Sequence, residues 1–364
     1  MRPAAGFIGQ AIKKQANMSE LSQNRLFSRR SFMSRTIGSA TLAGAGANLL
    51  TIKGLGSDSG PKAVNPWAYD DSQFRRTDPK LIGFQESSRF LVARVSPRCL
   101  CLTREEHLLI GAGKHVIEYT MEGMQVSEFL VSGEVRCLAT SKDDLIYVGL
   151  REHLEVYDRN GQRRGKWETP TTKAYLTAVA VSEADVFVAD AGSRVVIRYD
   201  RAGILKGRIG AKNGESRSTR FIVPSPFFDV EIAPDGLLRI TNPGKHCVEA
   251  YTFDGDLEFF WGKPGAAIEN FCGCCNPINL ALLRDGRVIT FEKGIPRVKI
   301  YSSQGAFESV VAGAESFGEN AKVCGPNDCT LGGLDGVVDS KGRIHILDLV
   351  ASNVRTMEPK KEEG

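Results

Sequence analysis

The chain has 364 residues, 42% of them hydrophobic and 25% charged, a balance that predicts a folded globular protein and excludes an intrinsically disordered one. Its formal net charge of +4 arises in the first 47 residues, which hold seven Lys or Arg and one acid, leaving 40 basic and 42 acidic residues beyond them. The rest of the chain thus offers no electrostatic basis for nucleic-acid binding, and we expect no nucleic-acid partner.

The amino-terminal segment has the features of an export signal. Arg29 and Arg30 are followed by Phe32 and then by a weakly apolar run over residues 36–50, too short and too small in side chain to span a bilayer. The pattern resembles a twin-arginine signal, which implies transport to the periplasm or cell envelope and is often used for proteins that carry a cofactor. We therefore interpret residues 1–50 as a signal peptide, with no stable membrane span after processing. The alternative is an accidental arginine pair in a disordered tail.

A repeated pattern follows a linker that we assign to residues 51–79. An aliphatic residue, two variable positions and usually a tyrosine recur along the chain, with a glycine four residues further on. The copies are Val116–Tyr119 with Gly123, Leu154–Tyr157 with Gly161, Val196–Tyr199 with Gly203, Val248–Tyr251 with Gly255, Val298–Tyr301 with Gly305, and a degenerate Val354–Met357. A spacing of roughly 40 to 55 residues with β-type runs in each unit predicts an all-β, six-bladed β-propeller over residues 80–358.

Each unit contains four β-type runs, except that the sixth lacks its last one. The chain ends in a charged segment, residues 359–364, that we expect to be a disordered tail. Residues 80–84 form an additional β-type run ahead of the first unit. We expect this run to pair at the outside of the last blade, which closes the ring and leaves no long sheet edge exposed.

The sequence Tyr-Asp-x-x-Gly at Tyr157 and Tyr199, preceded in the third unit by Val188–Asp190 and Arg194, resembles the NHL repeat. This resemblance covers about residues 80–358 and implies a six-bladed propeller. The first two units match the repeat least well. No Gly-His…Trp-Asp pattern is present, so the sequence does not favour a WD-type propeller.

Five of the nine cysteines lie in two short segments, and the propeller topology predicts that both segments flank blade five on one face. They are Cys272, Cys274, Cys275, Cys324 and Cys329. The same face is expected to carry the residue nine positions before each repeat tyrosine or its equivalent, together with a loop that brings an imidazole and a further thiol. These binding-face candidates are Asp190, Asn242, His246, Cys247, Glu292 and Asp348.

Three interpretations of the clustered cysteines remain open. Thiolates that converge from both segments bind a soft transition metal or an iron-sulfur cluster, although the spacing matches no standard zinc or ferredoxin motif. Alternatively, export to an oxidising compartment allows them to form disulfides, or they are free and buried. Glu292 likewise has two interpretations, as a base or ligand beside the cysteines or as a structural partner of Arg297. Cys99, Cys101 and Cys137 fall on inner strands, where we expect them to pack as small hydrophobic residues.

The segment Phe-x-Gly-Cys-Cys-Asn-Pro that begins at Phe271, with Glu-Lys-Gly and Arg-Val-Lys downstream, resembles a subset of exported bacterial NHL-type proteins. That resemblance implies no particular activity, and no catalytic residue is assigned. We expect a binding or scaffold protein with an unidentified protein or small-molecule ligand. The alternatives are a propeller enzyme, a hydrolase, lyase or redox protein that uses metal or acids on the same face, and a structural component of an envelope assembly.

Overall fold

The computed structural model describes residues 72–94, 96–211, 220–318 and 333–361. The chain divides into two compact units, Met1–Pro66 and Trp67–Gly364, and all described residues belong to the second. Arg29 and Arg30 of the expected signal, and the second cysteine segment with Cys324 and Cys329, therefore lie outside the described residues. In the described part of the chain, no helix has the length and apolar character needed to cross a bilayer.

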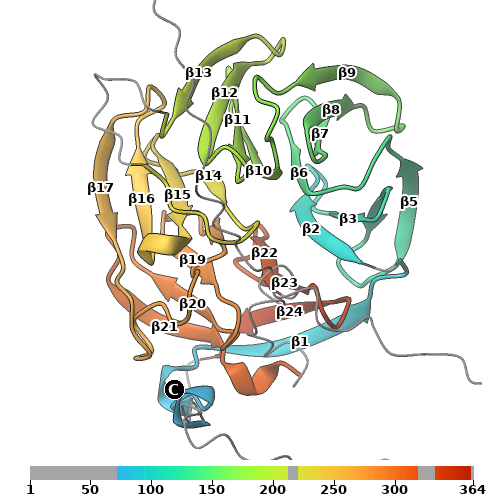
Figure 1. Cartoon of the computed structure of the whole chain (residues 1–364). Helices are drawn as coiled ribbons and strands as arrows, with labels where there is room; N and C mark the ends of the chain where they lie inside the picture. The colour runs from blue at the N-terminus through green and yellow to red at the C-terminus, as the bar shows by residue number, and fades with distance from the viewer. Residues whose placement is uncertain (1–71, 95, 212–219, 319–332, 362–364) are drawn as a thin grey trace, which may run out of the picture. The chain divides into compact units, whose positions relative to one another are not determined.

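The described strands form six four-stranded antiparallel sheets arranged in a ring, which confirms the predicted six-bladed propeller (Figure 1). Blade one consists of β2 (Pro97–Leu102), β3 (Leu108–Ala112), β4 (His115–Tyr119) and β5 (Gln125–Leu130). Blade two consists of β6 (Cys137–Thr140), β7 (Ile146–Gly149), β8 (His153–Tyr157) and β9 (Arg163–Glu168). Blade three consists of β10 (Leu176–Val181), β11 (Asp185–Asp190), β12 (Val195–Asp200) and β13 (Leu205–Ile209). Blades four and five consist of β14 (Val230–Ile232), β15 (Leu238–Asn242), β16 (Cys247–Tyr251), β17 (Leu257–Trp261); β18 (Asn279–Leu282), β19 (Val288–Phe291), β20 (Val298–Tyr301) and β21 (Phe307–Ala312).

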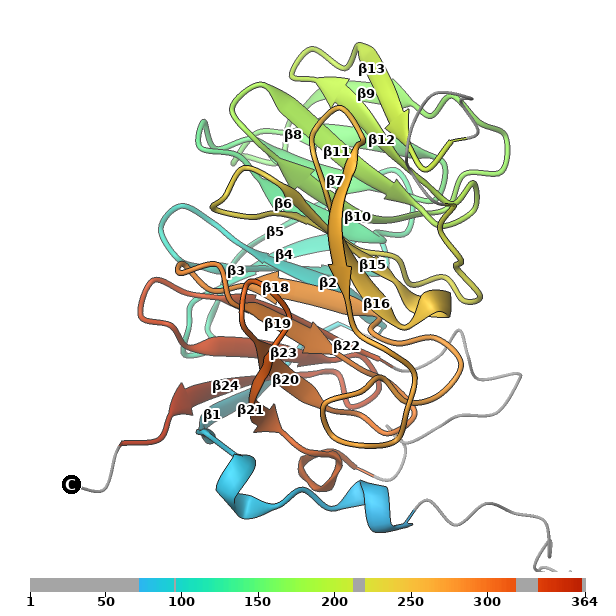
Figure 2. The same ribbon diagram turned by 90° about the vertical axis from the view of Figure 1, so that its left-hand side faces the viewer.

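Blade six is closed by the beginning of the propeller chain, as expected. Its strands are β22 (Leu334–Val338), β23 (Ile344–Asp348), β24 (Asn353–Pro359) and β1 (Phe84–Leu91). Strand β1 pairs antiparallel with β24, from Phe84 opposite Pro359 to Leu91 opposite Asn353, and the two lie side by side in Figure 2. The closing strand begins later than the expected residues 80–84, because Pro79–Leu81 form the short helix η2 with Asp78 as its N-cap.

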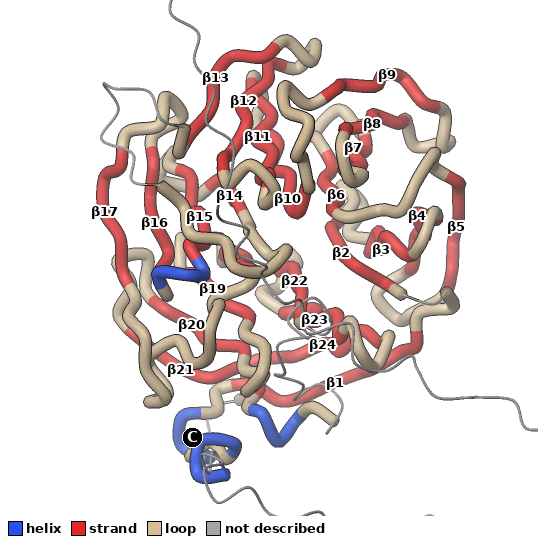
Figure 3. Tube along the Cα trace, viewed as in Figure 1, coloured by secondary structure: helices blue, strands red, loops and turns tan. Residues whose placement is uncertain are grey.

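The second strand of each blade is buried on both faces, whereas the outer strands keep exposed residues. All six residues of β11 are buried, but β9 exposes four of its six residues and keeps only Gly165 and Trp167 partly buried. Figure 3 shows that strands and loops make up nearly all of the ring, with only short helical turns. The hydrophobic core accordingly lies between neighbouring blades, as where Tyr147 of blade two and Val188 of blade three belong to one buried cluster.

The repeated tyrosine and glycine have a shared packing role. In blade two, the ring of Tyr157 lies 5.1 Å from that of Phe129 on the outer strand of blade one, and a Cβ on Gly161 would lie 2.6 Å from the Phe129 Cβ. In blade five, Tyr301 and Gly305 pack in the same way on Trp261 of blade four. The motif therefore marks where one blade presses on the outer strand of the preceding blade.

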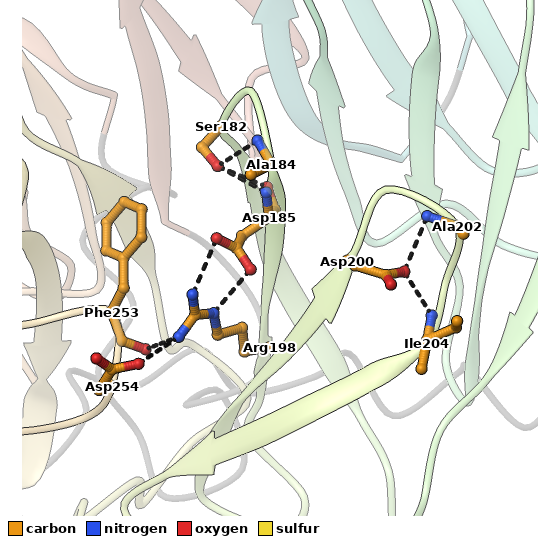
Figure 4. Close-up of polar contacts among 9 residues, drawn as sticks. All are labelled: Ser182, Ala184, Asp185, Arg198, Asp200, Ala202, Ile204, Phe253 and Asp254. Atoms are coloured by element: carbon orange, nitrogen blue, oxygen red, sulfur yellow. Dashed lines mark hydrogen bonds and ion pairs between the residues drawn. The ribbon is translucent and has the colours of Figure 1, made fainter.

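The aspartate in Tyr-Asp-x-x-Gly stabilises the turn before the glycine. Asp200 Oδ1 accepts hydrogen bonds of 2.9 Å from the backbone N–H groups of Ala202 and Ile204 (Figure 4). Nearby, the Arg198 guanidinium bonds both carboxylate oxygens of Asp185 and reaches the Asp254 carboxylate of blade four at 2.7 Å (Figure 4). The first contact fixes a turn within the blade and the second links neighbouring blades.

Candidate functional face beside blade five

The second strand of each blade from three to six ends at a fully buried polar side chain. Asp190, Asn242, Glu292 and Asp348 lie at or directly after the ends of β11, β15, β19 and β23, and each is 0% exposed. Since equivalent strands run in the same direction around a propeller, the ends of these strands lie on one face of the ring. Their burial shows that their carboxylate and amide groups point into the protein.

Asp190 and Asp348 cap the turns that follow their strands. Asp190 Oδ1 accepts hydrogen bonds from the backbone N–H groups of Tyr175, Gly192 and Ser193 at 2.8 to 3.1 Å. Asp348 Oδ1 accepts equivalent bonds from Val350 and Ala351. Both carboxylates therefore satisfy loop amides that would otherwise be buried without a partner.

Asn242 connects the loop before blade four to a buried glutamate. Its Oδ1 accepts a 2.9 Å bond from the Ile222 N–H, and its Nδ2 donates a 2.9 Å bond to Glu249 Oε1. Tyr251 donates its hydroxyl to the other Glu249 oxygen at 2.8 Å. Asn242 is thus part of a polar network within the blade.

Glu292 forms a buried ion cluster with two cations of β20 and the turn before it. Arg297 Nη2 lies 2.8 Å from Glu292 Oε2, and Lys299 Nζ lies 2.6 Å from Oε1, with all three side chains no more than 1% exposed. The structure therefore contains the expected structural pair of Glu292 with Arg297. Burial lowers the pKa of Lys299 to about 8, although the Glu292 carboxylate acts in the opposite direction.

The two cations of this cluster hold the connector between β17 and β18. Lys299 Nζ donates to the carbonyl oxygens of Ile268 and Asn270 at 2.9 and 2.8 Å, and Arg297 donates to those of Ala266 and Asn270 at 3.3 Å. The Lys299 ammonium also lies 4.7 Å from the centre of the Phe271 ring, which ends this stretch. The connector between β17 and β18, which contains no helix and no named strand, is thus held in place by buried charged side chains.

The cysteine loop, residues 272–275, follows directly on this connector. Cys274 is exposed, Cys272 is partly exposed and Cys275 is buried. The sulfur atoms of Cys274 and Cys275 are 3.3 Å apart, which is a thiol contact and not a disulfide bond. Gly273, with φ of +90°, supplies the left-handed backbone that turns the chain between the cysteines.

Asn276 fastens the cysteine loop to blade five. Its Nδ2 donates to the carbonyl oxygens of Cys272 and Lys293 at 2.6 and 2.9 Å, and its Oδ1 accepts from the Lys293 N–H at 3.0 Å. The side chain is 2% exposed. The position of the cysteines is therefore set by a buried amide that our sequence reasoning did not select, since only its neighbouring Pro277 marked it as a turn residue.

His246 and Cys247 lie on the other side of the connector, at the end of the short helix η3 (Pro243–Lys245). Burial lowers the pKa of His246, whereas the nearby Glu292 carboxylate raises it. Burial raises the pKa of the Cys247 thiol to about 12. A Cβ on Gly262 would lie 2.8 Å from the His246 carbonyl oxygen, which shows how closely the connector approaches this turn. In the ranges that the structure describes, however, no three His, Cys, Asp or Glu side chains form a ready metal site.

The remaining described cysteines, Cys99, Cys101 and Cys137, are buried on inner strands, as expected for core residues. Burial raises the pKa of each thiol. The inner strands also carry two acids that sequence reasoning passed over, Glu231 and Asp335. Their signal in the sequence is an acid within an otherwise apolar inner strand.

Comparison with known proteins shows the fold class and nothing finer. No protein-family model matches the chain, and no curated protein matches it either. Among solved structures, a streptogramin B lyase superposes with a TM-score of 0.54 at 11% sequence identity, over 75% of this chain and 97% of that one. A catalytically inactive virginiamycin B lyase from Staphylococcus aureus with quinupristin gives a TM-score of 0.52 at 10% identity, over 74% and 82% of the two chains. At this identity, the likeness establishes a shared propeller architecture alone.

Proposed function

We propose that the chain is an exported NHL-type propeller that acts as a binding protein through the face beside blade five, with the cysteine loop as its chemical element. The observation that carries this proposal is the way the loop is held. The sulfur atoms of the exposed Cys274 and the buried Cys275 lie 3.3 Å apart, and their loop is held by a clamp of buried polar groups, Asn276 and the Glu292 cluster. Burying charged groups costs free energy, so a surface loop that is held by buried charges is expected to have a function.

The chemistry of adjacent thiolates favours a soft transition metal or an iron-sulfur cluster as the bound group. Cys272, Cys274 and Cys275 would supply three sulfur ligands, and the proposed remaining ligands, Cys324 and Cys329, lie outside the described residues. The other outcome is a disulfide that joins the two cysteine segments in an oxidising compartment. Either chemistry makes the loop the centre of the binding face.

Metal analysis and a visible spectrum of anaerobically purified protein separate these two outcomes. The proposed metal site predicts bound metal that disappears in the double variant Cys274→Ser, Cys275→Ser. The matched control is Cys101→Ser, which removes an inner-strand thiol, lowers stability and leaves the metal content unchanged. The sulfur-centred site would be refuted if the parent protein contained no metal and its cysteines, like those of the Cys101→Ser control, reacted as free thiols.

The alternative of a propeller enzyme receives less support from the acids of this face. Asp190, Asp348 and Glu292 are already engaged by turn amides or by buried cations, so none is placed to exchange protons with a ligand at the surface. The solved lyase propellers share the architecture, but their identity to this chain is too low to transfer an activity. We therefore place binding ahead of catalysis.

Export by the twin-arginine route, to the periplasm or cell envelope, is part of the same proposal. Replacing Arg29 and Arg30 by lysine keeps the charge of the segment and removes the arginine pair. Fractionation of cells that express this variant should find the precursor in the cytoplasm and the parent protein outside it. Equal export of both forms would show that residues 1–50 do not act as a twin-arginine signal.

A further inference from the structure

The six inner strands enclose a cavity on the axis of the ring. Its volume is about 450 Å³, and its walls come from β2, β6, β10, β14, β18 and β22 together with the residues that flank them. Ligand sites in proteins usually measure about 300 to 1,000 Å³, so the cavity has room for a small molecule. It lies apart from the cysteine loop, none of whose residues line it.

Polar groups near the start of the inner strands tie the blades together around this cavity. Each uses one atom to bond the backbone of the next blade. These bonds are Thr177 Oγ1 to the Phe228 carbonyl at 2.6 Å, Leu280 N–H to Asp229 Oδ2 at 2.7 Å, Asn279 Nδ2 to the Leu334 carbonyl at 2.8 Å, and Leu100 N–H to Asp335 Oδ2 at 3.1 Å. The polar residues that line the cavity are thus held in fixed positions.

Three carboxylates line the cavity without a cationic partner. Asp229 and Glu231 come from blade four and Asp335 from blade six, and none forms an ion pair with a described lysine or arginine. Burial raises the pKa of Asp229 to about 6 and, with the Asp229 charge nearby, that of Asp335 to about 8. Burial and both neighbouring acids raise the pKa of Glu231 as well. These raised pKa values favour the neutral, protonated acids in the empty cavity, and a cation that entered it would favour their ionised forms by supplying the counter-charge they lack.

The opposite charge lines the cavity from blades one, two and five, as Arg98, Arg136 and Arg284. Arg98 lies near the start of β2, at the register shift between Pro97 and Cys99, and no hydrogen bond or ion pair joins its guanidinium to another described residue. Arg136 precedes β6, lies 4.9 Å from the centre of the Tyr175 ring and already pairs with the Glu134 carboxylate at 3.0 Å, so a ligand carboxylate would share its guanidinium with Glu134. Blade four, which carries two of the carboxylates, lies across the ring from blade one (Figure 1). Asp229 and Glu231 therefore face Arg98 across the cavity, whereas Asp335 of blade six lies beside blade one, where its Oδ2 accepts from the Leu100 N–H.

We propose that this axial cavity binds a small zwitterion, an amino acid or a short peptide, with its ammonium group toward Asp229, Glu231 and Asp335 and its carboxylate toward Arg98 and Arg136. An ammonium group donates three hydrogen bonds and supplies the missing counter-charge, and a guanidinium matches a carboxylate with two parallel bonds. The separation of the charges onto different blades selects a ligand that carries both groups. This site is independent of the cysteine loop and of any metal bound there.

Calorimetry with triglycine and its two blocked forms tests the proposal on the full propeller. Triglycine should bind, whereas N-acetyl-triglycine, which lacks the ammonium, and triglycine amide, which lacks the carboxylate, should each bind at least about tenfold more weakly. Asp335→Asn should weaken triglycine binding and reduce the difference in affinity between triglycine and N-acetyl-triglycine. Arg98→Gln should weaken triglycine binding and reduce the difference in affinity between triglycine and triglycine amide. Because Arg98 has no described partner, this variant is expected to fold normally.

Arg287→Gln is the control, because Arg287 lies in a surface turn outside the cavity. This variant should bind all three peptides with the same affinities as the parent protein. Circular dichroism establishes that each variant is folded. The absence of measurable triglycine binding at millimolar concentration would overturn the proposal. So would equal binding of triglycine and triglycine amide, which would indicate a site for cations alone, or equal binding by the Arg98→Gln variant and the parent.

Discussion

The repeat glycine of blade five gives the sharpest test of how the blades pack. Gly305 has φ of +90°, and an added Cβ would lie 2.1 Å from Cγ of Trp261 on the preceding blade. An L-residue in the left-handed region costs about 1–2 kcal/mol. Forcing a methyl group against a packed ring costs about 1–3 kcal/mol more. Gly305→Ala should therefore lower the free energy of unfolding by about 2–5 kcal/mol.

Gly286 provides the matched control for this change. It has φ of +88°, but its added Cβ would be no closer than 3.7 Å to Ser303, so Gly286→Ala carries the backbone cost alone. Urea unfolding followed by circular dichroism should place the two variants about 1–3 kcal/mol apart. Equal losses, within about 0.5 kcal/mol, would refute the claim that this glycine is required by contact with the neighbouring blade.

Three further predictions concern the buried polar groups. Asn276→Ala removes three hydrogen bonds and should cost about 3 kcal/mol in urea unfolding, against about 1 kcal/mol for the single bond lost in Asn279→Ala; equal costs would argue against a clamp. Glu292→Gln leaves two buried cations with less counter-charge and should cost about 3–5 kcal/mol, and a loss below about 1 kcal/mol would contradict the cluster's anchoring role. The pKa of Asp335 rises from 3.8 to about 8 on folding, so between these pH values the unfolded chain releases this proton while the folded chain keeps it, and the free energy of unfolding falls as pH rises. In the variant Asp335→Asn the free energy of unfolding should depend less steeply on pH over this range. A pH dependence equal to that of the parent would contradict the pKa shift.

Much of the fold was predictable because its information is local and repeated. The tyrosine and the glycine recur at fixed spacing in the first five units, and an aspartate joins them in units two and three. The structure explains each by a contact within a turn or with the preceding blade. Blade number and ring closure followed from this repetition. The start of the closing strand did not, because Asp78 and Pro79 form a helical turn whose local preference outweighs the β-type pattern after it.

The candidate sites were less predictable, because their geometry depends on residues far apart in the chain. Nothing near Asn276 indicates that its amide will meet the backbone of Lys293 across a hairpin. The axial carboxylates are harder still, since a lone acid in an inner strand reads as ordinary surface charge. Only the convergence of six strands places Asp229 close enough to influence Asp335. Sequence reasoning found the cysteine loop because its residues are adjacent, and missed the cavity because its residues are not.

The pairing of β1 with β24 also bears on how the protein is made. During translation, residues 84–91 leave the ribosome some 260 residues before their partner, roughly 15 to 50 seconds earlier at ordinary synthesis rates. Until residues 353–359 emerge, a nascent chain has an unsatisfied strand edge at each end of its growing arc of blades. Completion of the ring is therefore a late event in folding, and a chaperone that shields β1 in this interval would protect the propeller from pairing with a second copy.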